Sequence, residues 1–141
     1  MKLSARNILV GEVGQVTKGA VNALVDLVLS GGTHIFATIT NDSVDSLGLQ
    51  VGAEAFAIIK ASNVIVGTEL DKAKLSARNL LAGKVCKVVD GPVSAEIDLE
   101  VAPGLVISAV ITHESAKSLG FKVGDQAFAM IKASSVILGV K

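Results

Sequence analysis

Three short strings rich in hydrogen-bond donors occur twice in this chain. Serine and threonine hydroxyls donate hydrogen bonds, and arginine and lysine side chains can only donate. A tetrahedral dianion presents four acceptor oxygens, so these strings predict a site for an oxyanion. They read Leu-Ser-Ala-Arg-Asn at 3–7 and 75–79, Thr-x-x-Ser at 40–43 and 112–115, and Lys-Ala-Ser at 60–62 and 132–134.

Each string also has a purely structural interpretation. A threonine can cap a helix, a serine can shape a turn, and a lysine at a strand end can extend its stem into solvent. An arginine near a strand start can bridge to a carboxylate. These alternatives apply to Thr40, Thr112, Ser62, Ser134, Lys60, Lys132, Arg6 and Arg78. The residues alone leave both interpretations open.

The elements that must position these strings come in two copies. Residues 3–67, the first repeat, align without a gap on residues 75–139, the second repeat, at an offset of 72, with 35 of 65 positions identical by count. We therefore expect a first module at 1–68, a linker at 69–74 and a second module at 75–141. A module of about 65 residues is marginal as an independent fold. The two modules should share a core or associate further.

The apolar pattern within each repeat predicts strands and one short helix. Alternation over 21–29 places Val21 and every second residue after it on one core face, and 93–101 repeat that pattern. Residues 55–60 are apolar on both faces, which favours a fully buried strand. Thr40 precedes a helix of about two turns that Gly48 ends. The expected fold is mainly β, with two tandem five-stranded barrels of the oligonucleotide/oligosaccharide-binding (OB) kind.

Composition argues against several classes of partner. Lys+Arg and Asp+Glu are both 13, and the chain has no Trp or Tyr, so the charge and stacking surfaces of a nucleic-acid-binding protein are missing. Apolar runs are much shorter than the roughly 20 residues of a membrane span. Cys86 is the single cysteine, and no secretory leader pattern precedes the first motif. We expect a cytoplasmic protein.

The residues that usually carry catalysis do not assemble in the sequence. His34 and His113 stand at different repeat positions, and Cys86 aligns with Gly14. No His/Cys spacing of the zinc-binding kind occurs. We therefore expect no enzyme and no site for a free metal cation.

Taken together, four strings resemble the molbindin family, whose modules are also called Mop or TOBE-like. They are Lys-Leu-Ser-Ala-Arg-Asn, Gly-Ala-Val-Asn-Ala-x-Val, Ile-Thr-x-x-Ser and Ile-Ile-Lys-Ala-Ser-Asn-Val-Ile-Val-Gly. The likeness covers nearly the whole chain, and the duplication is similar to the family's tandem-module members. It implies a homotrimer of two-module chains that binds molybdate or tungstate, without an organic cofactor, at sites between subunits.

The resemblance also implies which residues hold the anion. One class of site would be lined by Ser4, Arg6, Thr40, Ser43, Lys60, Ala61 and Ser62. A second class would be lined by the equivalents Ser76, Arg78, Thr112, Ser115, Lys132, Ala133 and Ser134. A further site near the symmetry axis would use Gly19, Ala20, Val21 and Asn22. Pro92 has no N–H to donate, so the second copy departs from the pattern of that axial site.

Two roles are consistent with these expectations. The first is storage, buffering or delivery of the oxyanion by a free-standing binder. The alternative is a sensing or regulatory module of a molybdate transport or response system. No Gly-x-x-x-x-Gly-Lys string occurs, and no segment outside the repeats is long enough for a helix-turn-helix. These observations favour the free-standing binder.

Overall fold

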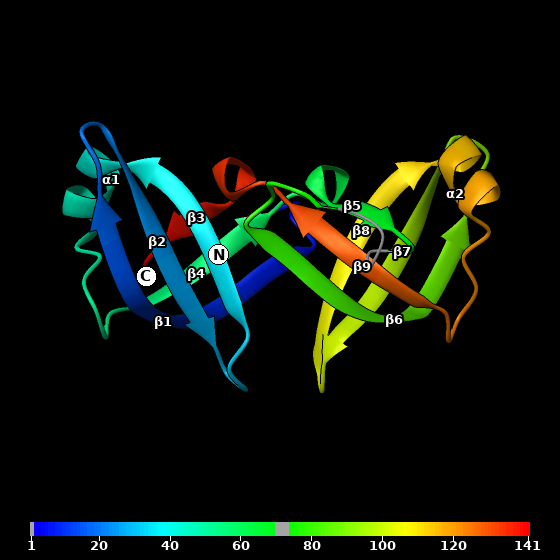
Figure 1. The fold of residues 1–141 in the computed structure, drawn as a ribbon, viewed down its shortest axis with the longest axis horizontal. Coiled ribbons are helices and arrows are strands. Elements are labelled where there is room, and N and C mark those ends of the chain that lie inside the picture. The colour runs from blue at the N-terminus through cyan, green and yellow to red at the C-terminus, as the bar shows by residue number, and fades with distance from the viewer. Residues whose placement is uncertain (1, 70–73) are drawn as a thin grey trace. The chain divides into compact units, whose positions relative to one another are not determined.

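The protein forms two compact β-sheet units in a computed structural model that describes residues 2–69 and 74–141. Unit 1 contains the chain up to Ile59 together with Lys132–Lys141, and unit 2 contains Lys60–Ile131. Each unit has a five-stranded antiparallel sheet and one short α-helix (Figure 1). The predicted fold class, mainly β with five strands and one short helix per unit, is confirmed.

The helices and strands follow the repeat closely. Unit 1 contains β1 (Asn7–Lys18), β2 (Asn22–Leu29), β3 (His34–Thr40), α1 (Asn41–Leu47), β4 (Glu54–Ile59), the 3-10 helix η3 (Ala133–Ser135) and β10 (Ile137–Gly139). Unit 2 contains the 3-10 helix η1 (Ala61–Asn63), β5 (Ile65–Gly67), β6 (Asn79–Asp90), β7 (Ser94–Ala102), β8 (Leu105–Thr112), α2 (His113–Leu119) and β9 (Gln126–Ile131). In the described part of the chain, no helix has the length and apolar character needed to cross a membrane.

One long strand organises each sheet. The first half of β1 pairs with β4, and its second half pairs with β2, so the strand is shared between two neighbours. Its register with β2 shifts at Gly14, which is a bulge. A Cβ atom on Gly11 would lie 2.4 Å from the carbonyl oxygen of Val28. Glycine at position 11 is therefore required for the close approach of the two backbones.

The last strand of each sheet comes from the other repeat. In unit 1, β10 pairs with β4, with Leu138 opposite Ala57. In unit 2, β5 pairs with β9, with Val66 opposite Ala129. The residues of each compact unit therefore differ from those of the modules predicted at 1–68 and 75–141. The module boundaries remain a prediction that describes the repeat in the sequence. Most of the predicted linker 69–74 lies outside the described residues.

The core follows the predicted alternation, with one correction. Ala23, Val25, Leu27 and Leu29 are all buried, as the period-two pattern requires. The assignment of Val21, and of its equivalent Val93, to the core face is wrong, because their exposed fractions are 69% and 81%. Both residues stand before the strand begins, in turns whose carbonyl groups accept hydrogen bonds from the following helix.

The last strand of each sheet comes from the other repeat, an arrangement we call strand exchange. It predicts which unit is destabilised when a buried side chain of that strand is shortened. Leu138 and Val66 occupy equivalent repeat positions and are both 7% exposed. We expect Leu138→Ala to cost about 2 to 5 kcal/mol and Val66→Ala somewhat less, because smaller groups are removed. Hydrogen exchange should show Leu138→Ala loosening β4 and Val66→Ala loosening β9, so each variant serves as the control for the other. Loosening of β9 by Leu138→Ala would contradict the exchanged pairing.

Candidate functional site

The Thr-x-x-Ser strings form the N-terminal ends of the two α-helices. Thr40 caps α1, since its Oγ1 accepts a hydrogen bond from the amide of Ser43 at 3.1 Å. Thr112 caps α2 through the amide of Ser115 at the same distance. The capping interpretation of both threonines is therefore confirmed. It does not exclude a ligand, because the serine hydroxyls have further capacity.

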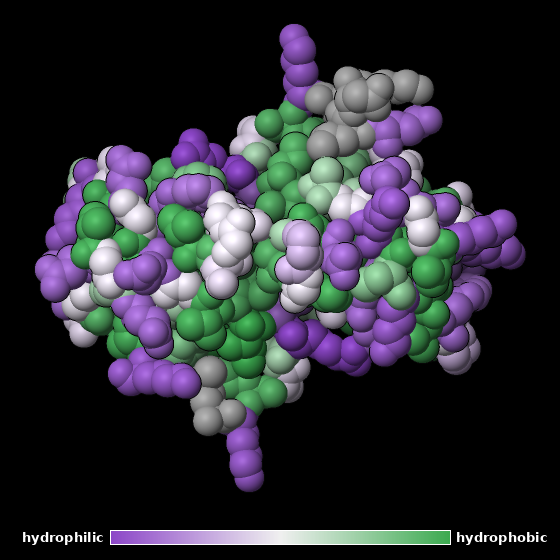
Figure 2. Space-filling view, turned by 90° about the horizontal axis from the view of Figure 1, so that it is seen from below, coloured by the Kyte–Doolittle hydropathy of each residue, from purple (hydrophilic) through white to green (hydrophobic). Residues whose placement is uncertain are grey.

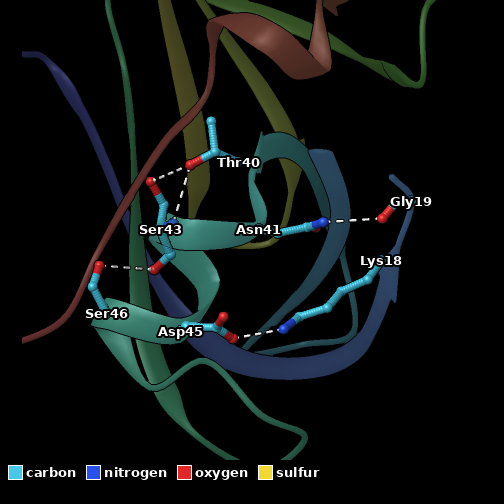
Figure 3. Close-up of polar contacts among 7 residues, drawn as sticks. All are labelled: Lys18, Gly19, Thr40, Asn41, Ser43, Asp45 and Ser46. Atoms are coloured by element: carbon cyan, nitrogen blue, oxygen red, sulfur yellow. Dashed lines mark hydrogen bonds and ion pairs between the residues drawn. The ribbon is translucent and has the colours of Figure 1, made fainter. Parts of the chain in front are cut away.

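The capping geometry leaves a serine hydroxyl available as a donor. The Thr40 hydroxyl donates to Oγ of Ser43 at 2.8 Å (Figure 3), and the Thr112 hydroxyl donates to Oγ of Ser115 at 2.9 Å. Each serine oxygen accepts this bond, so its own hydrogen can be donated elsewhere. Each helix N-terminus can therefore offer an O–H donor toward an anion, in addition to the positive end of its dipole.

A carboxylate also stands within each Thr-x-x-Ser string. Asp42 lies in the first turn of α1 and Glu114 in the first turn of α2, and both are exposed. These carboxylates stabilise the helix through a favourable interaction with its dipole, but they would repel a bound dianion. A dianion at these helix ends consequently requires cations from other segments.

The Lys-Ala-Ser strings form the two 3-10 helices. Lys60 precedes η1 and Lys132 precedes η3, with their carbonyl groups closing the turns and their side chains exposed. Among the described residues, neither lysine has a salt-bridge partner. Ala61 is buried, Ala133 is half-buried, and Ser62 and Ser134 are exposed. Both lysines can therefore turn toward a ligand, although extension into solvent fits the same geometry.

The Ser-Ala-Arg-Asn strings lead into the long strands. Asn7 is 2% exposed, and its side-chain Nδ2 donates to the carbonyl oxygen of Ile59 at 3.1 Å. This bond fixes the start of β1 against the end of β4. Sequence analysis missed this positioning role, although the repetition of the asparagine at position 79 was a signal for it. Ser4, Arg6, Ser76 and Arg78 are exposed, and both arginines have partners within the protein.

Strand exchange regroups the predicted site residues. Within unit 1, β3, which ends at Thr40, contacts η3 from the second repeat, and within unit 2, β8, which ends at Thr112, contacts η1 from the first. Unit 1 holds Ser4, Arg6, Thr40, Ser43, Lys132, Ala133 and Ser134. Unit 2 holds Ser76, Arg78, Thr112, Ser115, Lys60, Ala61 and Ser62. The grouping by repeat, predicted from sequence, therefore differs from the grouping by compact unit.

The predicted axial segment, Gly19–Asn22, is a turn attached to α1. The amide of Gly19 donates to the carbonyl oxygen of Asn22 at 2.7 Å, so it is not available to an anion. The backbone N–H of Asn41 donates to Val21 O at 2.8 Å. Its side-chain Nδ2 donates to Gly19 O at 2.9 Å, as Figure 3 shows. Only the amides of Ala20, Val21 and Asn22 could serve an axial anion. The equivalent turn in the second repeat contains Pro92, which has no N–H to donate.

A histidine–aspartate pair lies at the start of α2, next to the Thr112 cap. His113, the first residue of α2, has its Nδ1 2.8 Å from Oδ1 of Asp90. The hydrogen bond and the negative charge of Asp90 raise the pKa of His113, with smaller contributions from Glu114 and the Gly91 backbone, while desolvation opposes the shift. Sequence analysis missed His113 because it has no histidine counterpart in the first repeat. Among the described residues, no group of three or more His, Cys, Asp or Glu could hold a metal ion.

Comparison with known proteins gives matches over nearly the whole chain. The family model described as the TOBE domain matches residues 3–66 and 75–138. The molybdenum-pterin-binding protein MopA of Rhodobacter capsulatus is 46% identical over 99% of this chain. The molybdenum transport protein ModE of Azotobacter vinelandii is 41% identical over 99% of this chain. This chain spans about half of each relative, 53% of MopA and 52% of ModE.

A crystal structure matches the chain over its full length. It is described as the cytoplasmic molybdate-binding protein ModG with molybdate bound. The TM-score is 0.95 with 45% sequence identity, and the match covers 100% of both chains.

The His113–Asp90 pair predicts a pH-dependent contribution to folding stability. A pKa raised above the ordinary value of 6.5 adds stability that is fully present below the pKa of the unfolded state and is lost as pH rises through the folded value. The melting temperature of the wild type should therefore exceed that of His113→Asn most at about pH 5.5 and least at about pH 8. Calorimetry measures the difference in melting temperature between the two proteins. An equal difference at both pH values would contradict a stabilising interaction between His113 and Asp90. His34→Asn is the matched control for loss of an imidazole.

Proposed function

Because this chain belongs to the TOBE-domain family, as a molbindin with two modules in tandem, we propose that it binds molybdate or tungstate and catalyses no reaction. The observation that carries the proposal is the full-length likeness to ModG, a protein described as binding molybdate. The exposed donors at the helix and 3-10 helix ends supply suitable chemistry, because a fully deprotonated dianion needs donors and cations around it. Storage, buffering or delivery of the oxyanion in the cytoplasm is the corresponding role.

A sensing or regulatory role is the second candidate. The observation that favours it is the match to half of ModE, a molybdenum transport protein, by a chain that spans 52% of its length. Both candidates require the same anion site.

We propose that each anion site combines segments from both repeats within one unit. In unit 1, the Ser43 hydroxyl at the start of α1 acts together with Lys132, Ala133 and Ser134. In unit 2, the Ser115 hydroxyl acts together with Lys60, Ala61 and Ser62. The contacts of β3 with η3 and of β8 with η1 support this grouping. The lysine provides the cation that offsets the first-turn carboxylate.

Self-association is part of the proposed function. Each sheet has an apolar strip on its outer face, formed in unit 1 by the register partners Ile8, Ile58 and Ile137 and in unit 2 by Leu80, Met130 and Ile65. Ile137 is 62% exposed and Ile65 is 50% exposed, and hydrophobic side chains reach the molecular surface in Figure 2. Exposed apolar patches of this kind mark interaction surfaces. Copies of this chain are the proposed partners, in a homotrimer, with no nucleic-acid or membrane partner.

The proposed ligand predicts selectivity by size. Molybdate and tungstate have the same charge and nearly the same radius, so calorimetric titration should give similar affinities for the two. Sulfate and phosphate are smaller, and donors held at the larger radius cannot reach all their oxygens at good hydrogen-bond distance. Both should bind at least tenfold more weakly, which corresponds to about 1.4 kcal/mol. Sulfate binding as tightly as molybdate, at one pH and salt concentration, would contradict the proposed site.

The grouping of residues by unit predicts which substitutions are coupled. Lys132→Ala and Lys60→Ala should each weaken binding at their own site about ten- to hundredfold, because a charge-assisted hydrogen bond is lost. Ser43→Ala preserves the Thr40 cap and removes the donor. Its effect should be non-additive with Lys132→Ala and additive with Lys60→Ala in a double-mutant cycle. Additivity in the first pair and coupling in the second would overturn the grouping.

The apolar strip predicts an oligomer that the anion stabilises. Native mass spectrometry should show a trimer at micromolar concentration and the number of molybdate ions bound to it. A hundredfold excess over Kd should add about 2.7 kcal/mol of stability. Ile137→Glu should weaken the assembly, whereas Val51→Glu, at a residue 70% exposed outside the strip, should not. A monomeric wild type whose melting temperature is unchanged by molybdate would contradict this prediction.

A further inference from the structure

In the first repeat, the long strand is tied to the helix by a lysine–aspartate ion pair and by an asparagine side chain. Lys18, the last residue of β1, has its Nζ 2.6 Å from Oδ1 of Asp45 on α1 (Figure 3). Asn41, the first residue of α1, holds the adjacent turn with its neutral side-chain amide. These three positions together hold one lysine, one aspartate and a neutral amide.

In the second repeat, the same three positions carry different groups. Asp90 replaces Lys18, His113 replaces Asn41, and Lys117 replaces Asp45. The tie between strand and helix is now the 2.8 Å contact of Asp90 with His113. Protonation of the imidazole changes the net charge of this set from zero to +1. The second repeat therefore has a proton-dependent charge at a place where the first repeat has none.

This charge lies beside the candidate anion donors. His113 directly follows Thr112, with Cα atoms about 3.8 Å apart as in any trans peptide. Its backbone N–H donates to Val93 O at 3.0 Å, which fixes the residue between the cap and the preceding turn. Ser115 is two residues from His113 in the same helix, so their Cα atoms are about 5 Å apart, less than the Debye length of roughly 8 Å at physiological ionic strength. The side chain of His113 is 34% exposed and that of Asp90 is 55% exposed.

We propose that His113 and Asp90 make anion binding at Thr112–Ser115 proton-dependent, tighter on the acid side, while binding at Thr40–Ser43 does not vary. This inference rests on the proposed function. It gives the chain two kinds of oxyanion site that fill differently as pH changes.

The surroundings of His113 favour its protonated form. A cation at a helix N-terminus is opposed by the helix dipole, so the imidazolium needs a counter-charge. Asp90 at the end of β6 and Glu114 on α2 supply it, and both raise the pKa of His113. Of the strands that contact α2, β8 has no ionisable side chain. The acidic residues of β7 are Glu96, Asp98 and Glu100.

Nuclear magnetic resonance titration of the two imidazoles tests the coupling directly. Linkage requires that if protonation tightens molybdate binding by some factor, molybdate raises the imidazole protonation constant by the same factor. We expect molybdate to raise the pKa of His113 and to leave the His34 imidazole signals unaffected, since His34 pairs with Asp26 at the start of β3, the end of the strand opposite Thr40. An unchanged His113 titration at saturating molybdate would overturn the inference.

Calorimetry on variants gives the second measurement. In a Ser43→Ala, Lys132→Ala background, which weakens the site of unit 1, molybdate should bind roughly two- to fivefold more tightly at about pH 6 than at about pH 8. His113→Asn installs the residue of the first repeat and should abolish this difference, and Asp90→Asn should shift it to lower pH. His34→Asn should retain it.

The outcomes separate the two proposals. Absence of molybdate binding by the wild-type protein at either pH would contradict the proposed function itself. Binding whose pH dependence is the same with and without His113 would overturn only this inference.

Discussion

The pairing of β10 with β4 and of β5 with β9 is the constraint on which the rest of the structure depends. Without the strand from the other repeat, each sheet would have four strands, and β4 or β9 would have an open edge. A module of about 65 residues is marginal as an independent fold. Each repeat therefore completes the other's sheet. Unit 1 consists of two separate pieces of chain, and unit 2, although continuous, contains parts of both repeats. Duplication of a small module is consistent with this mutual requirement.

The exchange also determines which polar groups share a unit. A Lys-Ala-Ser string precedes each strand that completes a sheet, β5 or β10. The lysine therefore lies in the unit whose α-helix belongs to the other repeat. At that helix, the threonine hydroxyl is used by the cap, and the serine hydroxyl remains as a donor. One local motif thus initiates the helix and can also supply the donor of the proposed ligand site. The charged ties at the strand ends differ between repeats, which allows otherwise similar units to respond differently to protons.

Much of the fold was predictable because it depends on local pattern. The alternation of β2, the caps Thr40 and Thr112 and the terminating Gly48 are local signals, and the structure confirms them. The sequence predicted that the fifth strand pairs within its own repeat. Because the two repeats are so similar, their alignment cannot show whether this strand pairs with β4 or with β9. The sequence indicated Asn7 only through the repetition of asparagine in the second repeat and did not predict its burial. Val21 was wrongly assigned to the core because the strand begins one residue later than the alternation suggested. His113 required a three-dimensional contact with Asp90 to become informative.

Disulfide trapping tests the exchanged pairing most directly. Ile58 and Ile137 are direct register partners on β4 and β10, so cysteines at both positions, in a Cys86→Ser background, should form a bridge under mild oxidation. Peptide mapping should join the two segments within one chain. Cysteines at Ile58 and Ile65, which would pair if the first repeat completed its own sheet, should remain reduced. Efficient bridging of Ile58 with Ile65, and none with Ile137, would contradict the exchange and the site grouping built on it.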